Sequence, residues 1–215
     1  MKARDMASLI MCHVRLPLPR RAEQIMAMPA VKRRWTAREV RELIDQNPLA
    51  SPRYELVDGE LLVTPSPNAM HQSAVYLLQR ALNDYLNPIR LGRALASPLD
   101  VDLEPQLVVQ PDVLVVPLHE LARLRHEMPV RELVLAAEVL SPTSGRFDRV
   151  DKRVPYLRHV SEYWIVDLDD RLFERWQPND ERPQILVDEI VWNPIGALEA
   201  FRLDLPRFFA EVFGE

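Results

Sequence analysis

Two apolar stretches, Leu107-Val-Val-Gln-Pro-Asp-Val-Leu-Val-Val116 and Leu133-Val-Leu-Ala-Ala-Glu-Val-Leu140, decide the fold of this chain. Each has the length and the β-branched content of a buried strand, and each contains one acid, Asp112 or Glu138. Burying a carboxylate in a strand costs roughly several kcal/mol unless the group is paired or binds a metal. Because the two strands are expected to be neighbours, their acids predict a divalent-metal site.

A lysine follows the two strands, in Phe147-Asp-Arg-Val-Asp-Lys-Arg-Val-Pro-Tyr156. Mg²⁺ takes oxygen ligands, usually one or two carboxylates together with waters and phosphate oxygens. Such a cation lowers the pKa of a bound water, and an ammonium group can orient that water or offset developing charge. Asp112 and Glu138 as ligands, with the Val139 carbonyl as a further one and Lys152 as the ammonium, predict phosphodiester cleavage.

Each of these residues also has a purely structural explanation. Asp112 would face solvent at a bulge, Glu138 would pair with Arg146 or Arg149, and Lys152 would be solvated on a charged helix. Considered together, however, one acid in each of two apolar strands is uncommon by chance. The joint pattern therefore favours a functional site.

Composition sets the limits within which this site must operate. The chain has 215 residues, 47% of them hydrophobic and 27% charged, as in an ordinary globular protein. The net charge of −5 argues against a uniformly basic surface for nucleic acid, although a local basic patch and bound cations would suffice. The single cysteine, Cys12, excludes an internal disulfide and fits a cytoplasmic location. No window approaches the roughly 20 apolar residues of a membrane span, so no membrane partner is expected.

The order of local patterns predicts a mixed α/β domain with one central sheet flanked by helices. Residues 1–30 are expected to be a disordered N-terminal extension, and residues 31–215 a single domain. The expected strands are 53–57, 60–64, 99–104, 107–116, 133–140, 162–167, 172–177 and 185–192. The expected helices are 36–47, 68–88, 118–126, 147–159 and 206–213. The first helix begins with a capping box, and Asp58-Gly59 makes the first two strands a hairpin.

Several motifs occur in the same order as in one known family. They are Arg53-Tyr-Glu-Leu-Val-Asp-Gly-Glu-Leu61, Ser66-Pro-Asn-Ala-Met-His-Gln72, Pro111-Asp112, Glu138-Val-Leu-Ser-Pro-Thr-Ser144, Asp151-Lys152 and Glu162-Tyr-Trp-Ile-Val-Asp167. Through these motifs the chain resembles the Uma-type family of restriction endonucleases, which belongs to the PD-(D/E)xK nuclease superfamily. The resemblance implies a restriction-endonuclease-like core, a mixed sheet flanked by helices, with Asp112 and Glu138 as Mg²⁺ ligands.

The chain departs from the superfamily pattern at one position. Leu140 stands two residues after Glu138, where the superfamily has its lysine. In the Uma-type family the lysine comes from the following helix, and Lys152 is the matching residue. A helix can present a side chain to the edge of a sheet, so the resemblance implies a catalytic role for Lys152.

Weaker signals mark further candidates. Glu55 would bind a second metal or pair with Arg53. His71 would act as a general base or contact phosphate, although capping or packing is the more common role of such a residue. Tyr156 shares a helical face with Lys152 and would otherwise be a core residue. For Asp100, which alternates with apolar neighbours, a solvent-facing position is favoured.

The densest basic stretch supplies the candidate DNA contacts Arg146, Arg149 and Arg153. Lysine and arginine contacts to phosphates add affinity without reading sequence. Acids at positions 148 and 151 partly offset this stretch, so a solvated helix face is the alternative interpretation.

These observations predict an endonuclease that hydrolyses DNA phosphodiester bonds with Mg²⁺, or with Mn²⁺ in its place. A homodimer is expected by analogy with nucleases that address two strands. Two alternatives stay open. One is a catalytically silent nuclease-fold module that binds nucleic acid or a protein partner. The other is a metal-dependent hydrolase of a small substrate.

Overall fold

A computed structural model describes residues 33–47, 52–141, 145 and 147–215 of the chain. The expected N-terminal extension and Arg146 lie outside this part. The helices are α1 (Ala37–Gln46), α2 (Ala69–Ile89), α3 (Glu120–Leu124), α4 (Arg153–Leu157) and α5 (Leu205–Phe213), and a π-helix (Phe147–Lys152) leads directly into α4. None of the helices in the described residues is long and apolar enough to cross a bilayer.

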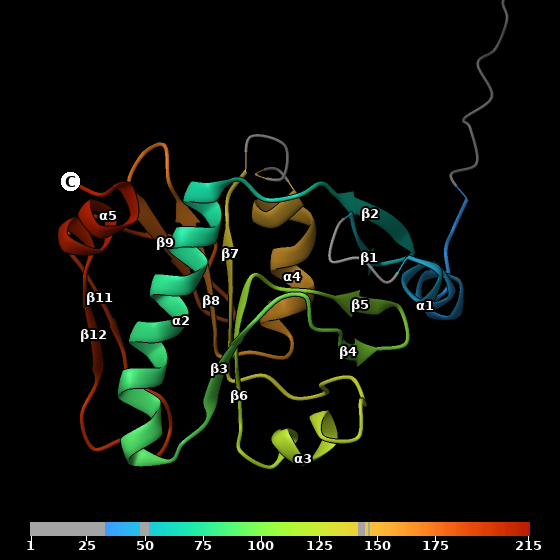
Figure 1. The fold of residues 1–215 in the computed structure, drawn as a ribbon, viewed down its shortest axis with the longest axis horizontal. Coiled ribbons are helices and arrows are strands. Elements are labelled where there is room, and N and C mark those ends of the chain that lie inside the picture. Colours follow the sequence, from blue (N-terminus) through green and yellow to red (C-terminus); the bar gives the residue numbers. More distant parts are fainter. Residues whose placement is uncertain (1–32, 48–51, 142–144, 146) are drawn as a thin grey trace, which may run out of the picture. The chain divides into compact units, whose positions relative to one another are not determined.

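The strands form three sheets within the described residues (Figure 1). The largest has the order β10 (Gln184–Leu186), β9 (Leu172–Trp176), β8 (Glu162–Asp167), β7 (Leu135–Val139), β6 (Val113–Val116) and β3 (Arg93–Ala96). Only β7 and β8 pair in parallel in this sheet. The second has the order β2 (Glu60–Thr64), β1 (Arg53–Val57), β5 (Leu107–Val109) and β4 (Val101–Glu104). A separate pair joins β11 (Glu189–Trp192) and β12 (Phe201–Asp204).

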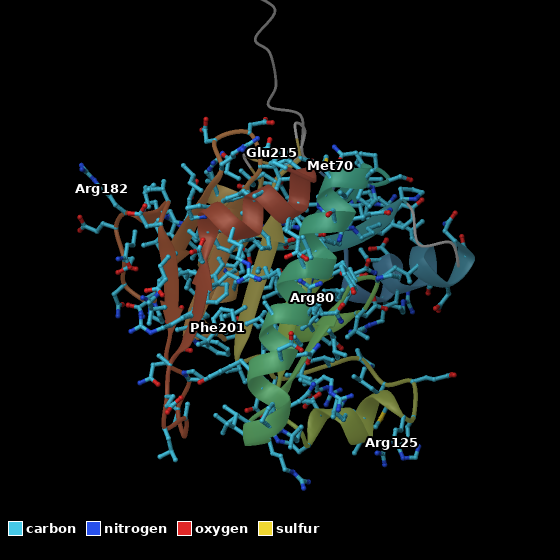
Figure 2. All side chains as sticks on the ribbon, turned by 60° about the vertical axis from the view of Figure 1, so that its left-hand side comes forward. Met70, Arg80, Arg125, Arg182, Phe201 and Glu215 are labelled. Carbon is cyan, nitrogen blue, oxygen red and sulfur yellow. The ribbon has the colours of Figure 1, made fainter. Side chains whose placement is uncertain are left out.

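Helices α2 and α5 and the β11–β12 pair cover one face of the six-stranded sheet (Figures 1 and 2). The sheet contributes Val113, Ala137 and Trp164 to this core, among others. Helix α2, which carries Met70 and Arg80 in Figure 2, is tied to α5 by an ion pair between Arg80 and Glu211 at 2.6 Å.

The opposite face of the six-stranded sheet packs against α4 and the four-stranded sheet. Leu114, Ala136 and Ile165 point to this side. Because side chains alternate along a strand, Glu138 follows Ala136 onto the same face. The sheet thus presents Glu138 to the layer that carries Lys152 and Glu55.

The expectation of one strand over 107–116 is wrong. Strand β5 belongs to the four-stranded sheet and β6 to the six-stranded sheet, and Gln110-Pro111-Asp112 is the junction between them. Proline has no amide hydrogen to donate to a ladder, so the strand breaks there. Side chains satisfy the freed carbonyls, since Arg53 donates to the Gln110 oxygen at 3.3 Å and Ser97 to the Pro111 oxygen at 2.6 Å.

Some of the other expectations are confirmed and others are wrong. The mixed α/β class is confirmed, but a single central sheet is not. The expected strand 185–192 is also split, into β10 and β11, which lie in different sheets. The capping box is confirmed, with the Thr36 amide donating to Glu39 at 2.9 Å. The hairpin is confirmed too, with the positive φ angles of 48° at Asp58 and 83° at Gly59 that its tight turn requires.

Candidate active site

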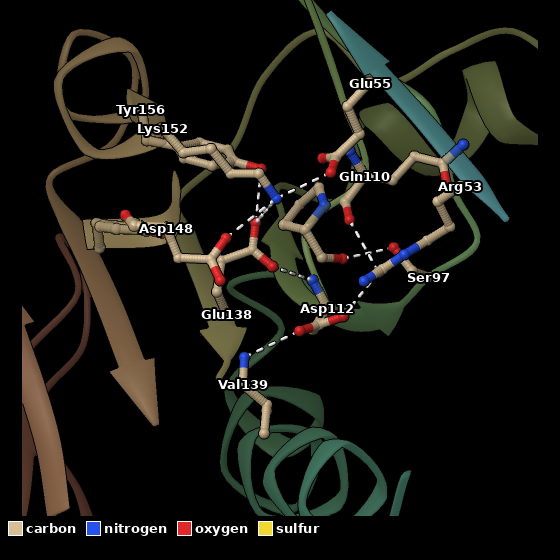
Figure 3. Close-up of polar contacts among 12 residues, drawn as sticks. Arg53, Glu55, Ser97, Gln110, Asp112, Glu138, Val139, Asp148, Lys152 and Tyr156 are labelled. Atoms are coloured by element: carbon tan, nitrogen blue, oxygen red, sulfur yellow. Dashed lines mark hydrogen bonds and ion pairs between the residues drawn. The ribbon is translucent and has the colours of Figure 1, made fainter. Parts of the chain in front are cut away.

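Asp112 and Glu138, which are far apart in the chain, lie side by side and hold each other through backbone amides (Figure 3). The amide of Asp112 donates to Glu138 Oε2 at 3.2 Å, and the amide of Val139 donates to Asp112 Oδ2 at 2.9 Å. The antiparallel pairing of β6 and β7 brings them together, because Val113 lies opposite Ala137. Asp112 is 4% exposed, so it does not face solvent at a bulge, and Glu138 is 1% exposed.

Lys152 reaches the same point from the π-helix. Its Nζ lies 2.9 Å from Glu55, 3.1 Å from Glu138 and 3.3 Å from Asp148. Tyr156, one turn further along, donates from its hydroxyl to Glu138 at 3.3 Å. The sequence-based alternative of a solvated lysine does not hold, because this side chain is 4% exposed.

Arg53 and His71 hold Asp112 from the other side. The Arg53 guanidinium lies 2.7 Å from Asp112 Oδ1, and His71 Nε2 lies 3.0 Å from Asp112 Oδ2. His71 stands in the first turn of α2, where its backbone amide donates to the Asn68 side chain that caps the helix. The cap of α2 is therefore Asn68 rather than His71, and the His71 side chain instead contacts Asp112.

The side chains of the site open onto a cavity of about 170 Å³. Its walls include Arg53, His71, Asp112, Glu138, Asp148 and Lys152. The loop that precedes α2 and the residues after β7 complete the wall, so the cavity lies where strand β7 ends and helix α2 begins. Glu55 is not among the described residues that line it.

The environment of the site lowers the pKa of Asp112 and raises the pKa of Glu138. Burial opposes ionisation of Asp112, but the hydrogen bond to His71 and the charge of Arg53 outweigh it and lower the pKa of Asp112. Burial raises the pKa of Glu138 well above its usual value, and nearby Asp112, Asp148 and Glu55 raise it further, against the charge of Lys152. Burial would lower the pKa of Lys152, yet Glu138, Glu55 and Asp148 hold it well above its ordinary value.

The donor set of the site fits a hard divalent cation. The site contains four carboxylates, Glu55, Asp112, Glu138 and Asp148, but only two basic side chains, Arg53 and Lys152. The described residues contain no ready-made cluster of three or more His, Cys, Asp or Glu ligands. Mg²⁺ needs only one or two carboxylates when water completes its shell, and the cavity beside Asp112 and Glu138 offers that space.

Three other candidates from the sequence lie outside the cavity wall. Asp100 accepts a hydrogen bond from the side-chain amide of Gln110 at 2.7 Å and lines a separate cavity of about 570 Å³. Arg149 bonds to Asp167 at 2.7 Å and to Glu174 at 2.6 Å rather than to Glu138. The Arg153 guanidinium lies 4.1 Å from the centre of the Trp176 ring.

Two members of the site were not predicted from the sequence. Asp148 is 2% exposed and touches Lys152, but beside Asp151 it looks like one more charge on a solvated helix. Its spacing of four residues from Lys152, and of eight from Tyr156, was the available signal. Arg53 was considered only as a partner of Glu55, whereas it binds Asp112.

Comparisons with known proteins identify the family and the fold of this chain. A family model described as "Putative restriction endonuclease" (Uma2) matches residues 38–205. A crystal structure of a "putative nuclease belonging to DUF820" from Anabaena variabilis is similar at a TM-score of 0.63 and 18% identity. The match covers 80% of this chain and 97% of that one, which shows a shared fold. None of the curated proteins compared with the chain matches it. Because the family model spans most of its length, this chain belongs to the Uma2 family.

Proposed function

We propose that this protein is a Mg²⁺-dependent endonuclease that hydrolyses DNA phosphodiester bonds, with Mn²⁺ able to replace Mg²⁺. One observation carries the proposal. Asp112 and Glu138 are joined by a hydrogen bond of 3.2 Å at the wall of a cavity, with Lys152 at 3.1 Å from Glu138. Two carboxylates and an ammonium group around one space form the minimal set for metal-assisted phosphodiester hydrolysis.

In this proposal Asp112 and Glu138 hold the metal ion. The ion would supply Lewis acidity toward the phosphate and a water of lowered pKa. A carboxylate offers about four lone-pair sites, and each of the two acids already accepts hydrogen bonds from three groups. Each therefore keeps room for about one further bond, which is what a cation shared by two acids requires.

The protein's own residues position the reacting groups. Arg53, His71 and the Val139 amide fix both oxygens of Asp112, so the carboxylate is oriented before a cation arrives. Lys152 contributes a buried positive charge beside Glu138, where it can orient water or offset negative charge on the phosphate. Burial strengthens both effects because the local dielectric constant is low.

DNA is proposed as the substrate because the family description names a restriction endonuclease. The chain has a net charge of −5, so the metal ion and local arginines must supply the attraction to phosphate. Arg149 and Arg153 remain predicted phosphate contacts, although acids and a ring already engage them. A homodimer stays a prediction.

Plasmid cleavage tests the proposal. The wild type is compared with Asp112→Ala, Glu138→Ala and the matched control Glu162→Gln, each with Mg²⁺, Mn²⁺ or EDTA. Glu162 is a buried acid of the same sheet that pairs with Arg175 away from the cavity. Metal-dependent nicking by the wild type and the control, lost in both alanine variants, is the expected result.

Two other results would contradict the proposal. If folded wild type leaves the plasmid intact with both metals yet retains labelled DNA in EDTA, the chain is a silent binding module. If it hydrolyses a small phosphodiester with metal but never a plasmid, the substrate is a small molecule. Equal nicking by all four proteins would point to a contaminating nuclease.

A further inference from the structure

The ammonium group of Lys152 forms ion pairs with three carboxylates. Glu55 comes from β1 in the four-stranded sheet, Glu138 from β7 in the six-stranded sheet, and Asp148 from the π-helix (Figure 3). Of these three acids only Glu138 is a metal ligand in the proposed site. The other two need a different role, because burying each carboxylate is costly without one.

Glu55 has the geometry of a positioning residue rather than a metal ligand. It is fully buried and does not line the cavity among the described residues. Its Oε1 accepts the Gln110 amide hydrogen at 2.8 Å, and its Oε2 lies 2.9 Å from Lys152. Both oxygens therefore face protein groups, and one of these groups is the junction that leads to Asp112.

Asp148 holds Lys152 from within the same helical segment. The two residues are four apart, and the Asp148 oxygen lies 3.3 Å from Nζ. The Tyr163 hydroxyl of β8 donates to the backbone oxygen of Asp148 at 3.0 Å and so ties this turn to the sheet. A π-helix is uncommon and often marks a functional site, and here it carries Asp148 and Lys152 on one side.

We propose that Glu55 and Asp148 position Lys152 beside Glu138 and that the site consequently binds one divalent cation, not two. The inference rests on the proposed function. A lysine side chain has a flexible four-carbon stem, so it needs partners to stay at one point. Because Glu55 and Asp148 contact Lys152 from β1 and from the π-helix, they would keep it in place when Glu138 also binds a cation. Glu55 lies outside the cavity wall, and Asp148 lines the wall but is held to Lys152 within one helical segment. Asp112 and Glu138, which are joined through backbone amides, are therefore the pair that we assign to the metal.

Two variants test the roles of these acids. Glu55→Gln and Asp148→Asn keep the shape of each side chain and remove its charge, and Glu162→Gln is the buried-acid control. We expect kcat for plasmid nicking to fall about 10-fold to 100-fold in both variants, as when partners of catalytic groups are lost. KM should stay within a few-fold of wild type, and the control should match wild type.

Metal binding supplies a readout that does not depend on activity. Calorimetric titration with Mn²⁺ should show one equivalent bound by wild type, by Glu55→Gln and by Asp148→Asn, with similar affinity. Asp112→Asn should lose that binding. Two equivalents in wild type, or loss of binding in Glu55→Gln, would overturn the inference.

The two measurements separate the inference from the function on which it rests. Cleavage by wild type with unchanged kcat in both variants overturns the inference and leaves the nuclease proposal intact. If wild type cleaves nothing, the nuclease proposal fails, and the Mn²⁺ titration alone decides how many cations the site binds. If either variant fails to fold, thermal denaturation of the other variant replaces the kinetic measurement. The Tm loss that this variant causes is measured once in the wild-type protein and once in protein that also carries Lys152→Met. A smaller Tm loss in the Lys152→Met background supports the proposed contact, and an equal loss rejects it.

Discussion

Two buried acids, Glu138 and Glu162, stand near opposite ends of the parallel strand pair β7–β8. Glu162 binds the side chain of Arg175 through both oxygens and also accepts the Trp164 indole hydrogen at 2.8 Å. Glu138 shares Lys152 with two other acids and borders a cavity. The first acid is matched by a cation, whereas the second belongs to a cluster with more acids than cations.

The difference distinguishes a structural ion pair from a site that can bind a cation. Both acids are almost completely buried, so burial alone does not identify function. An excess of acids beside an open space leaves negative charge that a bound cation can neutralise. Four changes would test this distinction, beginning with the largest expected effect.

Removing Lys152, which three acids share, should destabilise the protein more than removing Arg175 from its ion pair with Glu162. Lys152→Met leaves three buried carboxylates without their ammonium group and should lower the free energy of unfolding by roughly 3–5 kcal/mol. Arg175→Met should cost less, because Glu162 keeps the Trp164 indole and lies near the strand start. Urea denaturation in EDTA measures both. A larger loss in Arg175→Met would remove the distinction.

Adding a divalent cation should stabilise the protein through the site alone. At about a hundredfold excess over Kd, a ligand that binds only the folded state adds about 2.7 kcal/mol. The Tm of wild type and of Glu162→Gln should therefore rise with Mn²⁺, whereas the Tm of Asp112→Asn should not. An equal rise in Asp112→Asn would place the binding elsewhere on the chain.

The ionisation of Glu138 should make stability depend on pH in a definite direction. Because its pKa in the folded protein is well above its ordinary value of 4.5, the folded protein holds a proton that the unfolded chain releases. The stability from Glu138 is therefore complete below pH 4.5 and is lost as pH rises through the folded pKa.

Glu138→Gln removes this dependence. Relative to wild type, the variant should gain stability as pH rises from 4.5 toward the pKa of Glu138 in the folded protein, at up to about 1.4 kcal/mol per pH unit. Urea titrations in EDTA at several pH values measure the difference, with Glu162→Gln as control. A difference that stays constant with pH, or that shrinks as pH rises, would contradict the assigned shift.

The smallest effect concerns the stacked tyrosines, whose ring centres lie 5.1 Å apart. Tyr156→Phe removes one hydrogen bond to Glu138 and should cost about 1 kcal/mol, as a typical hydrogen bond does. Tyr163→Phe removes the bond to the Asp148 backbone and should cost a similar amount. Thermal denaturation compares them. A loss several times larger in Tyr156→Phe would mean that the phenol organises the acid cluster.

Some features of the site could be predicted because they break a local rule. An acid inside an apolar run is unusual, so Asp112 and Glu138 could be predicted as site residues. The hairpin and the capping box could be predicted for another reason, because they follow from turn and cap chemistry. Asp148 breaks no rule, since an acid in a charged helix is ordinary. Its role depends on the π-helix and on β1, which lies almost a hundred residues away along the chain.

The division of residues 107–116 between two sheets could not be predicted from the sequence, for a different reason. Val108 and Val115 look alike in sequence, but each belongs to a different ladder, and pairing partners are not encoded in a single apolar run. Pro111 was the local sign of the break. The β11–β12 pair could not be predicted either, because residues 185–192 look like one strand in the sequence but are divided between two sheets.

The junction at Gln110-Pro111-Asp112 also links the assembly of the candidate site to the completion of folding. Glu138 comes from one sheet and Glu55 from the other, and the junction connects the two. A nascent or damaged chain with only one sheet assembled would lack part of the arrangement around Lys152. Under the proposed function, nuclease activity would then appear only once both sheets are assembled, and partly folded copies would be inactive.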